Sequence, residues 1–318
     1  MDMIEQDLNI IIRFTARSKI GSGHLFHSLS LFKEFQTKNI HSQLILKDCD
    51  DFVYKKLDDM KIKYTVETSN NMFSELFIDK RKNIVVNDIL DTDEVEIKFL
   101  KSFGFKVVNI EDKGTGADFA DGVINALYDK STKNLNELNG PRYTVLREDF
   151  KTAKDKLDYS KNKKIVVSFG GTDPANLSEK IYSSLKNSDL PFVVVAPPFR
   201  DIGIKDSRIV YNIENIAEFF SKARIGITSS GRTMHEFVYL GIPIISISQH
   251  DREDKHSLNR HEFIEYLGQA NELTEEKILK SILALYNNPK KINYLKDNID
   301  KIVDGQGLSR IAEFIINI

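Results

Sequence analysis

Short runs of branched apolar residues alternate with longer amphipathic stretches along the first half of the chain. The run NIIIRF precedes a stretch in which Leu25, Leu29 and Phe32 recur at i, i+4 and i+7, a spacing that places one apolar stripe on a helix. The runs QLILK, NIVVN and FKVVNI follow with helical stretches between them, and Gly104 is expected to end the helix before the last run. Strands alternating with helices at this spacing predict a parallel sheet built from crossover units.

A second alternating set follows a segment rich in turn residues. Residues 113–147 contain GTGADFADG, an Asn-rich patch and NGP, which are typical of turns and linkers. The later runs KIVVSF, PFVVVA, RIGITS and IPIISIS predict strands, and in GGTDP we expect Asp173 to cap a helix that has Pro174 at its first position. The sequence therefore predicts two α/β domains, at 1–145 and 146–318, with the last helix a candidate to pack back on the first domain.

Composition excludes several classes of protein. The chain has 318 residues, 41% hydrophobic and 29% charged, which is ordinary for a globular protein of about two domains. A formal net charge of −2, with lysines and acids interspersed, does not indicate a nucleic-acid partner. Cys49 is the single cysteine, so a disulfide framework and a cysteine metal site are excluded and a reducing cytoplasm is favoured. The acidic start does not suit a signal peptide, and no apolar run approaches the ~20 residues of a membrane-spanning helix.

The first candidate ligand site is the turn GSGH, which comes after the first predicted strand and contains Gly21, Gly23 and His24. In open α/β sheets, ligands bind outside the carboxyl ends of strands, where helix N-termini offer free N–H groups to anions. A histidine at such a corner can act as a base or an electrostatic partner near neutral pH. The spacing does not match the dinucleotide fingerprint GxGxxG. A glycine turn with a locally hydrogen-bonded histidine is the alternative explanation for this motif alone.

The second candidate is SFGGTDP, at the corresponding turn of the second half. Gly170 and Gly171 leave main-chain donors uncovered, and Thr172 adds a hydroxyl. A glycine turn followed by a capped helix explains the motif equally well.

The third candidate, TSSGRTMHEF, is the most informative. Ser230 and Gly231 lie between a strand and a helix that Arg232 and Thr233 open, so that amides, hydroxyls and a cation at one helix start could hold a diphosphate. Glu236 lies one turn further on, and a carboxylate can accept from both hydroxyls of a ribose. The alternatives are a helix-dipole acid for Glu236 and a surface cation for Arg232. The histidine of this motif is expected to face solvent or pack locally.

Two further polar groups follow predicted strands. In SQHDREDKHSLNR, the side chains of Gln249, His256 and Asn259 are of types that bind sugar hydroxyls, while most of the charges are expected to form a solvated face. Asp88 directly follows NIVVN, and the acids after it have no histidine partner and no EF-hand spacing, so that helix N-terminal acids are favoured over a metal site. A GxSxG serine and a P-loop lysine are absent from the sequence.

Four motifs together resemble a known family: GSGHLFHSLSL, GPRYTVLREDF, VVSFGGTDPANLSEKI and SSGRTMHEFVYLGIPIISIS. They come in the order seen in the nucleotide-sugar hydrolase of pseudaminic acid biosynthesis, whose relatives include the spore-coat polysaccharide proteins. More distantly, the layout is similar to the lipid-II-forming N-acetylglucosaminyltransferase. The resemblance extends from about residue 9 to about residue 285. It implies a GT-B-like α/β fold, with two Rossmann-like domains whose parallel sheets face a central cleft, and neither a metal nor a cofactor.

The resemblance also implies roles for the candidate residues. The helix that begins near Arg232 would bind the diphosphate of UDP and Glu236 the ribose, while His24, with Asp88, would be catalytic. The family usually has arginine where this chain has His27, which puts His27 on the sugar side. The family also tends to have Asp-His-Tyr where this chain has NDIL, which retains Asp88 and lacks the tyrosine.

The leading hypothesis is a hydrolase that cleaves a UDP-linked diacetamido-trideoxy hexose, with no nucleic-acid partner. The first alternative is a GT-B glycosyltransferase that passes the sugar of a UDP-sugar to a glycan or lipid. The second alternative is a non-catalytic module that binds a nucleotide sugar. The sequence leaves open whether the nucleotide is UDP or CMP and which oligomer forms.

Overall fold

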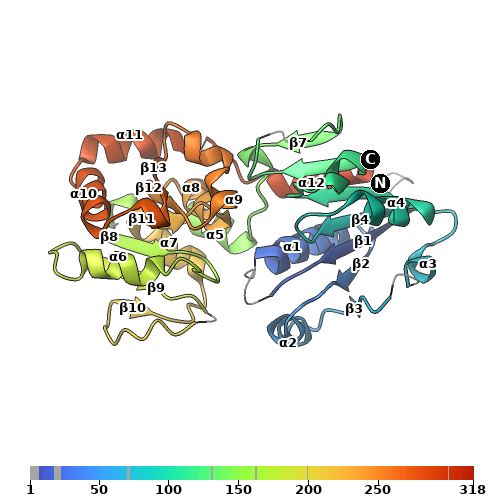
Figure 1. Ribbon diagram of the computed structural model, residues 1–318, viewed down its shortest axis with the longest axis horizontal. Coiled ribbons are helices and arrows are strands. Elements are labelled where there is room, and N and C mark those ends of the chain that lie inside the picture. The colour runs from blue at the N-terminus through green and yellow to red at the C-terminus, as the bar shows by residue number, and fades with distance from the viewer. Residues whose placement is uncertain are drawn as a thin grey trace. The chain divides into compact units, whose positions relative to one another are not determined.

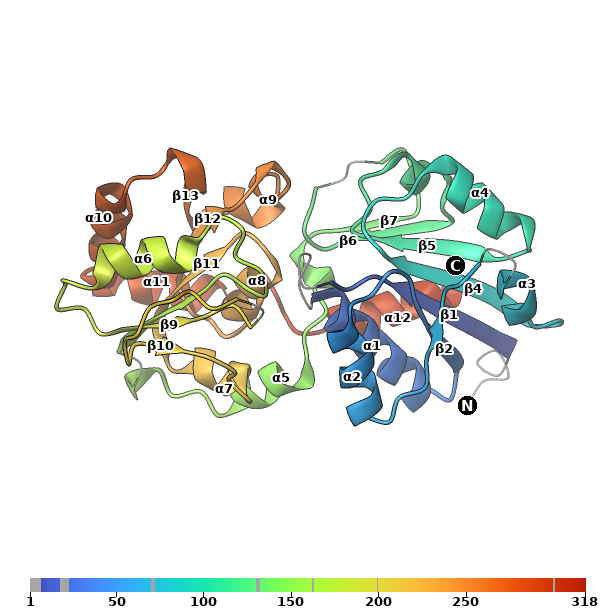
Figure 2. The same ribbon diagram turned by 60° about the horizontal axis from the view of Figure 1, so that its bottom comes forward.

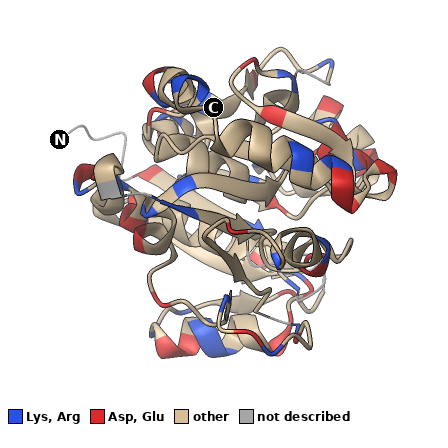
Figure 3. Cartoon of the chain, turned by 90° about the vertical axis from the view of Figure 1, so that its left-hand side faces the viewer, with Lys and Arg blue, Asp and Glu red and all other residues tan. Residues whose placement is uncertain are grey.

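The computed structural model divides the chain into two compact units, the first made of residues 1–145 and 306–318 and the second of residues 146–305 (Figure 1). The structure describes residues 7–17, 23–69, 72–129, 132–161, 163–198, 200–299 and 301–318. Among these residues, no helix combines the length and the apolar character needed to span a membrane. Figure 3 shows cationic and acidic residues interspersed on the face that it presents.

The first unit contains a seven-stranded sheet in the order β3-β2-β1-β4-β5-β6-β7, in which every neighbouring pair is parallel. Its strands are β1 (Leu8–Phe14), β2 (His41–Leu46), β3 (Thr65–Val66), β4 (Lys82–Asp88), β5 (Lys106–Ile110), β6 (Gly122–Asn125) and β7 (Glu137–Asn139). Its helices are α1 (Gly23–Thr37), α2 (Asp51–Asp59), α3 (Met72–Leu76), α4 (Glu94–Ser102) and α12 (Gly307–Asn317), with short 3₁₀ turns η2 (Thr115–Phe119) and η3 (Pro141–Tyr143).

Alternation along β1 divides the core of this unit into two layers. Ile10 and Ile12 belong to a cluster that includes residues of α1, α2 and α12, whereas Ile11 belongs to a second cluster with residues of α3 and α4. Successive side chains of a strand point to opposite faces, so a strand covered by helices on both sides is apolar throughout. Figure 2 shows α12 beside α1, and Ile311 of α12 is fully buried in the shared cluster.

The second unit contains a six-stranded sheet in the order β10-β9-β8-β11-β12-β13, also parallel. Its strands are β8 (Lys164–Ser168), β9 (Phe192–Val195), β10 (Ile209–Val210), β11 (Ala223–Ser229), β12 (Ile244–Ser248) and β13 (Glu265–Gln269). Its helices are α5 (Glu148–Asp155), α6 (Leu177–Leu185), α7 (Ile216–Ser221), α8 (Arg232–Tyr239), α9 (Asp251–Asp254), α10 (Glu275–Tyr286) and α11 (Pro289–Ile299), with 3₁₀ turns η4 (Tyr159–Lys161), η5 (Ser257–Arg260) and η6 (Ala270–Glu272). One core layer includes residues of α6, α10 and α11, and the other includes residues of α5, α7 and α8.

Several local predictions can be compared with these elements. The helix expected to end at Gly104 does so: α4 closes just before it, and Gly104 has a φ of +89°, which glycine adopts without strain. The prediction that 113–147 is turn and linker was wrong, because β6 and β7 lie within it. These strands have four and three residues, too few for an alternating pattern to be detected.

The start of α6 also differs from the prediction. The helix begins at Leu177 rather than at Pro174. The carboxylate of Asp173 nevertheless accepts hydrogen bonds from the backbone N–H groups of Leu177 and Ser178, both at 2.8 Å. Asp173 therefore caps the helix as expected, but from four residues before its first turn.

Candidate functional site

Each sheet has a point at which the strand order reverses. The order in the first unit runs outward from β1 to β3 on one side and from β4 to β7 on the other, and the second sheet does the same from β8 and β11. In open α/β sheets, ligands bind outside the carboxyl ends of the strands at such a point. Asp88 ends β4 opposite Phe14 of β1, and Ser168 ends β8 opposite Thr228 of β11. The predicted glycine turns therefore follow the strands that flank the two switch points.

A cluster of four polar residues lies at the switch point of the first unit. Asp88 is fully buried, and its Oδ1 lies 2.5 Å from Nδ1 of His24. Its Oδ2 lies 2.9 Å from Nδ1 of His27 and 3.1 Å from the hydroxyl of Ser28. The three partners are at i, i+3 and i+4 of α1, a spacing that places them on one helix face. One carboxylate thus holds two imidazoles and a hydroxyl.

The charge of this cluster follows from its contacts. Burial alone would raise the pKa of Asp88, but the charges and hydrogen bonds of His24 and His27 hold that pKa well below its usual range. Asp88 is therefore a carboxylate at neutral pH and can only accept, so each histidine donates from Nδ1. When His24 is uncharged, that tautomer leaves its Nε2 with a lone pair, the arrangement by which a carboxylate and a histidine form a general base.

The structure places His27 beside Asp88. The sequence predicts a sugar contact, but the side chain is buried and its Nδ1 is bonded to Asp88. His27 therefore helps to fix the carboxylate that orients His24. Gly23 opens α1 and is half-buried, while Gly21 lies outside the described residues.

The switch point of the second unit brings two glycine turns together. Gly170 follows β8 with a φ of +77°, and a β-carbon at this position would lie 3.7 Å from Oγ1 of Thr233 on α8. Gly171 and Thr172 are half-buried beside it. The left-handed conformation explains why a glycine occupies position 170. Although they are far apart in the sequence, the two turns therefore lie next to each other.

The N-terminus of α8 suits an anion. Gly231 occupies the N-cap position in an extended conformation, so no side chain caps the helix. The first N–H groups of an α-helix have no partner within the helix and carry the positive end of its dipole. Arg232 and Thr233 open the helix and are half-buried. The predicted diphosphate-binding residues are therefore placed where an anion is favoured.

The hydroxyl of Ser230 belongs to a buried hydrogen-bond network. It is fully buried and lies 2.7 Å from the hydroxyl of Ser246 and 2.7 Å from the side-chain oxygen of Asn259. The amide of Asn259 also donates to the carbonyl of Glu253 at 2.8 Å. Side chains that form an interior network are not presented to a ligand. Ser230 and Asn259 therefore tie the loops after β11 and β12 together.

Glu253 was not predicted, because it appeared to be one of several charges in a polar loop. Its carboxylate accepts from the backbone N–H of Gln249 at 2.8 Å, and a β-carbon at Gly231 would lie 3.5 Å from its Oε1. Burial raises the pKa of Glu253 to about 7. The side chain of Gln249, expected to contact sugar, accepts from the N–H of Ala175 at 3.4 Å, which joins this loop to the GGTDP turn.

Glu236 lies beside a cation. Its Oε1 is 3.7 Å from Nη2 of Arg147. Burial raises the pKa of Glu236 to about 7, Arg147 and Arg232 lower it, and Asp149 raises it. The carboxylate can therefore change its charge near neutral pH.

Two histidines of this unit lie in the interior. His256, expected to bind sugar, is buried, and burial lowers its pKa well below the ordinary value. His235, expected to face solvent or pack locally, is also fully buried, and burial lowers its pKa to about 4. Both are therefore neutral at pH 7.

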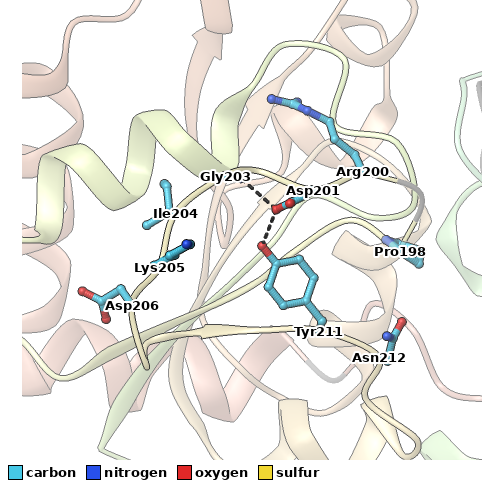
Figure 4. Close-up of a pocket in the computed structure, with 9 residues that line it drawn as sticks. All are labelled: Pro198, Arg200, Asp201, Gly203, Ile204, Lys205, Asp206, Tyr211 and Asn212. Atoms are coloured by element: carbon cyan, nitrogen blue, oxygen red, sulfur yellow. Dashed lines mark hydrogen bonds between the residues drawn. The ribbon is translucent and has the colours of Figure 1, made fainter.

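A hollow of about 740 Å³ lies at the carboxyl ends of β9 and β10 (Figure 4). Asp201 accepts from the hydroxyl of Tyr211 at 3.2 Å, and Arg200 donates to the carbonyl of Asp173 at 3.1 Å and pairs with Glu179. Arg200 thus links the hollow to the GGTDP turn. This hollow could not be predicted from the sequence, because its two sides come from a polar loop and the end of a two-residue strand. Its lining is Pro198, Arg200, Asp201, Gly203, Ile204, Lys205, Asp206, Tyr211 and Asn212.

Within the described part of the chain, no three side chains among His, Cys, Asp and Glu are grouped to hold a metal ion.

Comparison with known proteins relates the chain to two sequences and to many structures. No family model matches it. It is 30% identical to the uncharacterized protein MJ1062 of Methanocaldococcus jannaschii over 94% of its own length, and it spans 64% of that protein. It is 20% identical to the spore coat polysaccharide biosynthesis protein SpsG of Bacillus subtilis, over 93% of this chain and 94% of SpsG.

Two solved structures illustrate the fold. MurG of Acinetobacter baumannii superimposes with a TM-score of 0.65 at 14% identity, covering 98% of this chain and 100% of MurG. The UDP-GlcNAc 2-epimerase of M. jannaschii superimposes with a TM-score of 0.59 at 10% identity, covering 98% and 100%. The chain has a GT-B-like fold of two parallel-sheet α/β domains. One fold supports different reactions, so the fold alone does not identify the reaction.

Proposed function

We propose that this protein is an enzyme that hydrolyses a UDP-linked sugar to UDP and free sugar. The observation that carries the proposal is the Asp88 carboxylate held 2.5 Å from Nδ1 of His24 at the switch point of the first unit. A buried carboxylate that fixes the tautomer of a histidine is a recurrent arrangement for general-base catalysis. We further propose a 2,4-diacetamido-2,4,6-trideoxy hexose as the sugar, because of the motifs shared with the hydrolases of nonulosonic acid biosynthesis and the relationship to SpsG.

The nucleotide is assigned to the second unit. The uncapped N-terminus of α8, with Arg232 at its first position, would bind the diphosphate, and the adjoining turn of Gly170 and Gly171 would let main chain approach it. Glu236 would accept from the ribose hydroxyls. The hollow beside β9 and β10 is within the size range of small-molecule sites, and its link through Arg200 to the GGTDP turn favours it as the place of the base.

The proposed hydrolysis needs only water, His24, Asp88 and the groups at the start of α8. Nε2 of His24 takes a proton from water, whose oxygen forms a bond to the anomeric carbon as the bond from that carbon to the diphosphate oxygen breaks. Asp88 stabilises the imidazolium that results. The departing UDP carries the bonding electrons as negative charge, which the helix terminus and Arg232 stabilise. Stabilisation of developing charge is usually the largest catalytic contribution.

The test is UDP release from UDP-activated diacetamido sugars in the absence of any acceptor. We expect the wild-type protein to release UDP and His24→Ala to be slower by about 10²–10⁴-fold, the usual contribution of general acid–base catalysis. His41→Ala is the matched control, since His41 contacts Asn9 at the opposite end of the sheet. Equal release by wild type and His24→Ala would refute the role of His24, and no release from any sugar would refute hydrolysis.

Transfer to a glycan or lipid acceptor is the second candidate, favoured by the fold that the chain shares with MurG. UDP release that requires an added acceptor would indicate a transferase, because a hydrolase requires only water. Tight binding of UDP without turnover of any sugar, with or without an acceptor, would instead indicate a non-catalytic binding module.

A further inference from the structure

Arg147 is held against α8 from the start of the neighbouring helix. It directly precedes α5, and its guanidinium lies 5.0 Å from the ring centroid of Phe150, which is fully buried. Nε lies 3.6 Å from Oδ1 of Asp149, and Nη2 lies 3.7 Å from Oε1 of Glu236. The aromatic ring and the two acids fix the cation beside the carboxylate that we assign to the ribose.

The contact with Glu236 is an ion pair without a hydrogen bond. At 3.7 Å the two atoms are too far apart for a hydrogen bond, and the described residues donate none to the Glu236 carboxylate. The side chain is 22% exposed. Both oxygens of Glu236 are thus available as acceptors while a positive charge lies next to them, which is the state a carboxylate needs to bind a diol.

Three charged groups act on Glu236. Arg147 and Asp149 act from the start of α5, and Arg232 acts from the first turn of α8 itself. Burial raises the pKa of Glu236 to about 7, and Arg147 is the strongest of the charges that oppose this rise. The start of α5 therefore supplies one cation, Arg147, and one acid, Asp149. Their opposite effects on the pKa of Glu236 decide how much of this carboxylate is charged at a given pH.

We propose that Arg147 is a positioning residue for ribose recognition, which holds Glu236 as an oriented carboxylate whose oxygens accept from the 2′- and 3′-hydroxyls of the nucleotide. The proposal rests on the assignment of UDP to the second unit. It adds that the preference for a ribonucleotide depends on pH and that Arg147 sets the pH at which the preference appears.

The size of the effect follows from the charge. With a pKa of about 7, about half of the Glu236 side chains are ionised at pH 7. An opposite charge at this range lowers a carboxyl pKa by about 1–3 units, so that loss of Arg147 leaves at most about a tenth ionised. The preference for UDP over 2′-deoxy-UDP should then fall at least about fivefold at pH 7, and it should recover as the pH is raised.

The experiment is calorimetric titration of the full-length protein with UDP and with 2′-deoxy-UDP between pH 6 and pH 9. In the wild type, the affinity ratio should rise with pH around a midpoint near 7. Arg147→Met should move the midpoint upward, whereas Arg147→Lys, which keeps the charge, should stay near the wild type. Lys151→Met is the matched control: it removes a cation from α5 that pairs with Glu148, and it should leave the midpoint unchanged.

Glu236→Gln gives a second measurement that does not depend on how well the Arg147 variants fold. It should abolish both the preference for UDP and its pH dependence. An unchanged midpoint in Arg147→Met, or a persistent preference in Glu236→Gln, would overturn the inference while leaving UDP binding intact. Failure of the wild type to bind UDP would overturn the proposed function as well, so the two failures are distinguishable.

Discussion

Replacement of Asp88 by asparagine should damage both stability and activity. Asp88 is fully buried and accepts from three side chains, with Oδ1 serving His24 and Oδ2 serving His27 and Ser28. Asparagine keeps one acceptor oxygen and turns an NH₂ group towards an imidazole N–H. Either His24 or the other two residues must then lose their partner.

The magnitude follows from the hydrogen bonds. A hydrogen bond to a charged group contributes about 1.5–3 kcal/mol, and a buried donor left without an acceptor costs about 1–3 kcal/mol. Because relaxation recovers part of the loss, we expect Asp88→Asn to lower the free energy of unfolding by about 2–4 kcal/mol. We expect UDP release to fall by about 10²–10⁴-fold, since His24 would no longer be held in the tautomer that leaves Nε2 free.

Urea unfolding followed by circular dichroism, together with UDP release, measures both effects. Asp58→Asn is the control, because Asp58 is an exposed acid of the same unit that accepts from the hydroxyl of Tyr64. This substitution should change stability by no more than about 0.5 kcal/mol. If Asp88→Asn matched the control in stability and kept full activity, the cluster would be neither a structural nor a catalytic centre.

Three further predictions concern the stability of each unit. Gly170→Ala places a β-carbon on a residue with a φ of +77° and should lower the free energy of unfolding by about 1–2 kcal/mol. Gly171→Ala, at a glycine without a left-handed φ, is the control in the same urea titration. His235 is neutral in the folded protein because burial lowers its pKa to about 4, so its contribution to stability is full above the ordinary pKa of about 6.5 and is lost as the pH falls towards 4. The urea midpoints at pH 5 and pH 7.5 should therefore differ less in His235→Gln than in the wild type. Equal differences in the two proteins would contradict this prediction. Ile311→Ala opens a cavity between α12 and the first sheet and should lower the free energy of unfolding by about 2–5 kcal/mol. Ile316→Ala, at a half-buried position of the same helix, should lower it by less. Equal losses in the two variants would contradict the placement of α12.

The α/β fold could be predicted from the sequence because its central strands are strongly apolar. Ile10, Ile11 and Ile12 fill both layers of the first unit, and such runs separated by helical stretches are typical of a parallel sheet. β6 and β7 were not predicted, because strands of so few residues are too short to show a periodic pattern. Their place in the sheet is decided by the pairing of β6 with β5 and of β7 with β6, which is a tertiary effect.

The candidate sites were predicted less completely. The residue types at His24 and Asp88 suggested chemistry, but the sequence could not show that one carboxylate also binds His27, because 61 residues separate the two positions. Polar residues such as Ser230 and Asn259 look alike in a sequence whether they face a ligand or the interior. Burial distinguishes them, and burial depends on the assembled sheet.

We propose that His24, oriented by Asp88, activates water to cleave a UDP-linked sugar. Proton NMR of the purified protein with UDP-activated 2,4-diacetamido-2,4,6-trideoxy hexoses, in the absence of any acceptor, tests it most directly. We expect the anomeric signal of one such UDP-sugar to be replaced by the signals of the free sugar, and we expect His24→Ala to prevent this on the same timescale. Persistence of every UDP-sugar signal with the wild type, or conversion at the same rate by His24→Ala, would contradict it.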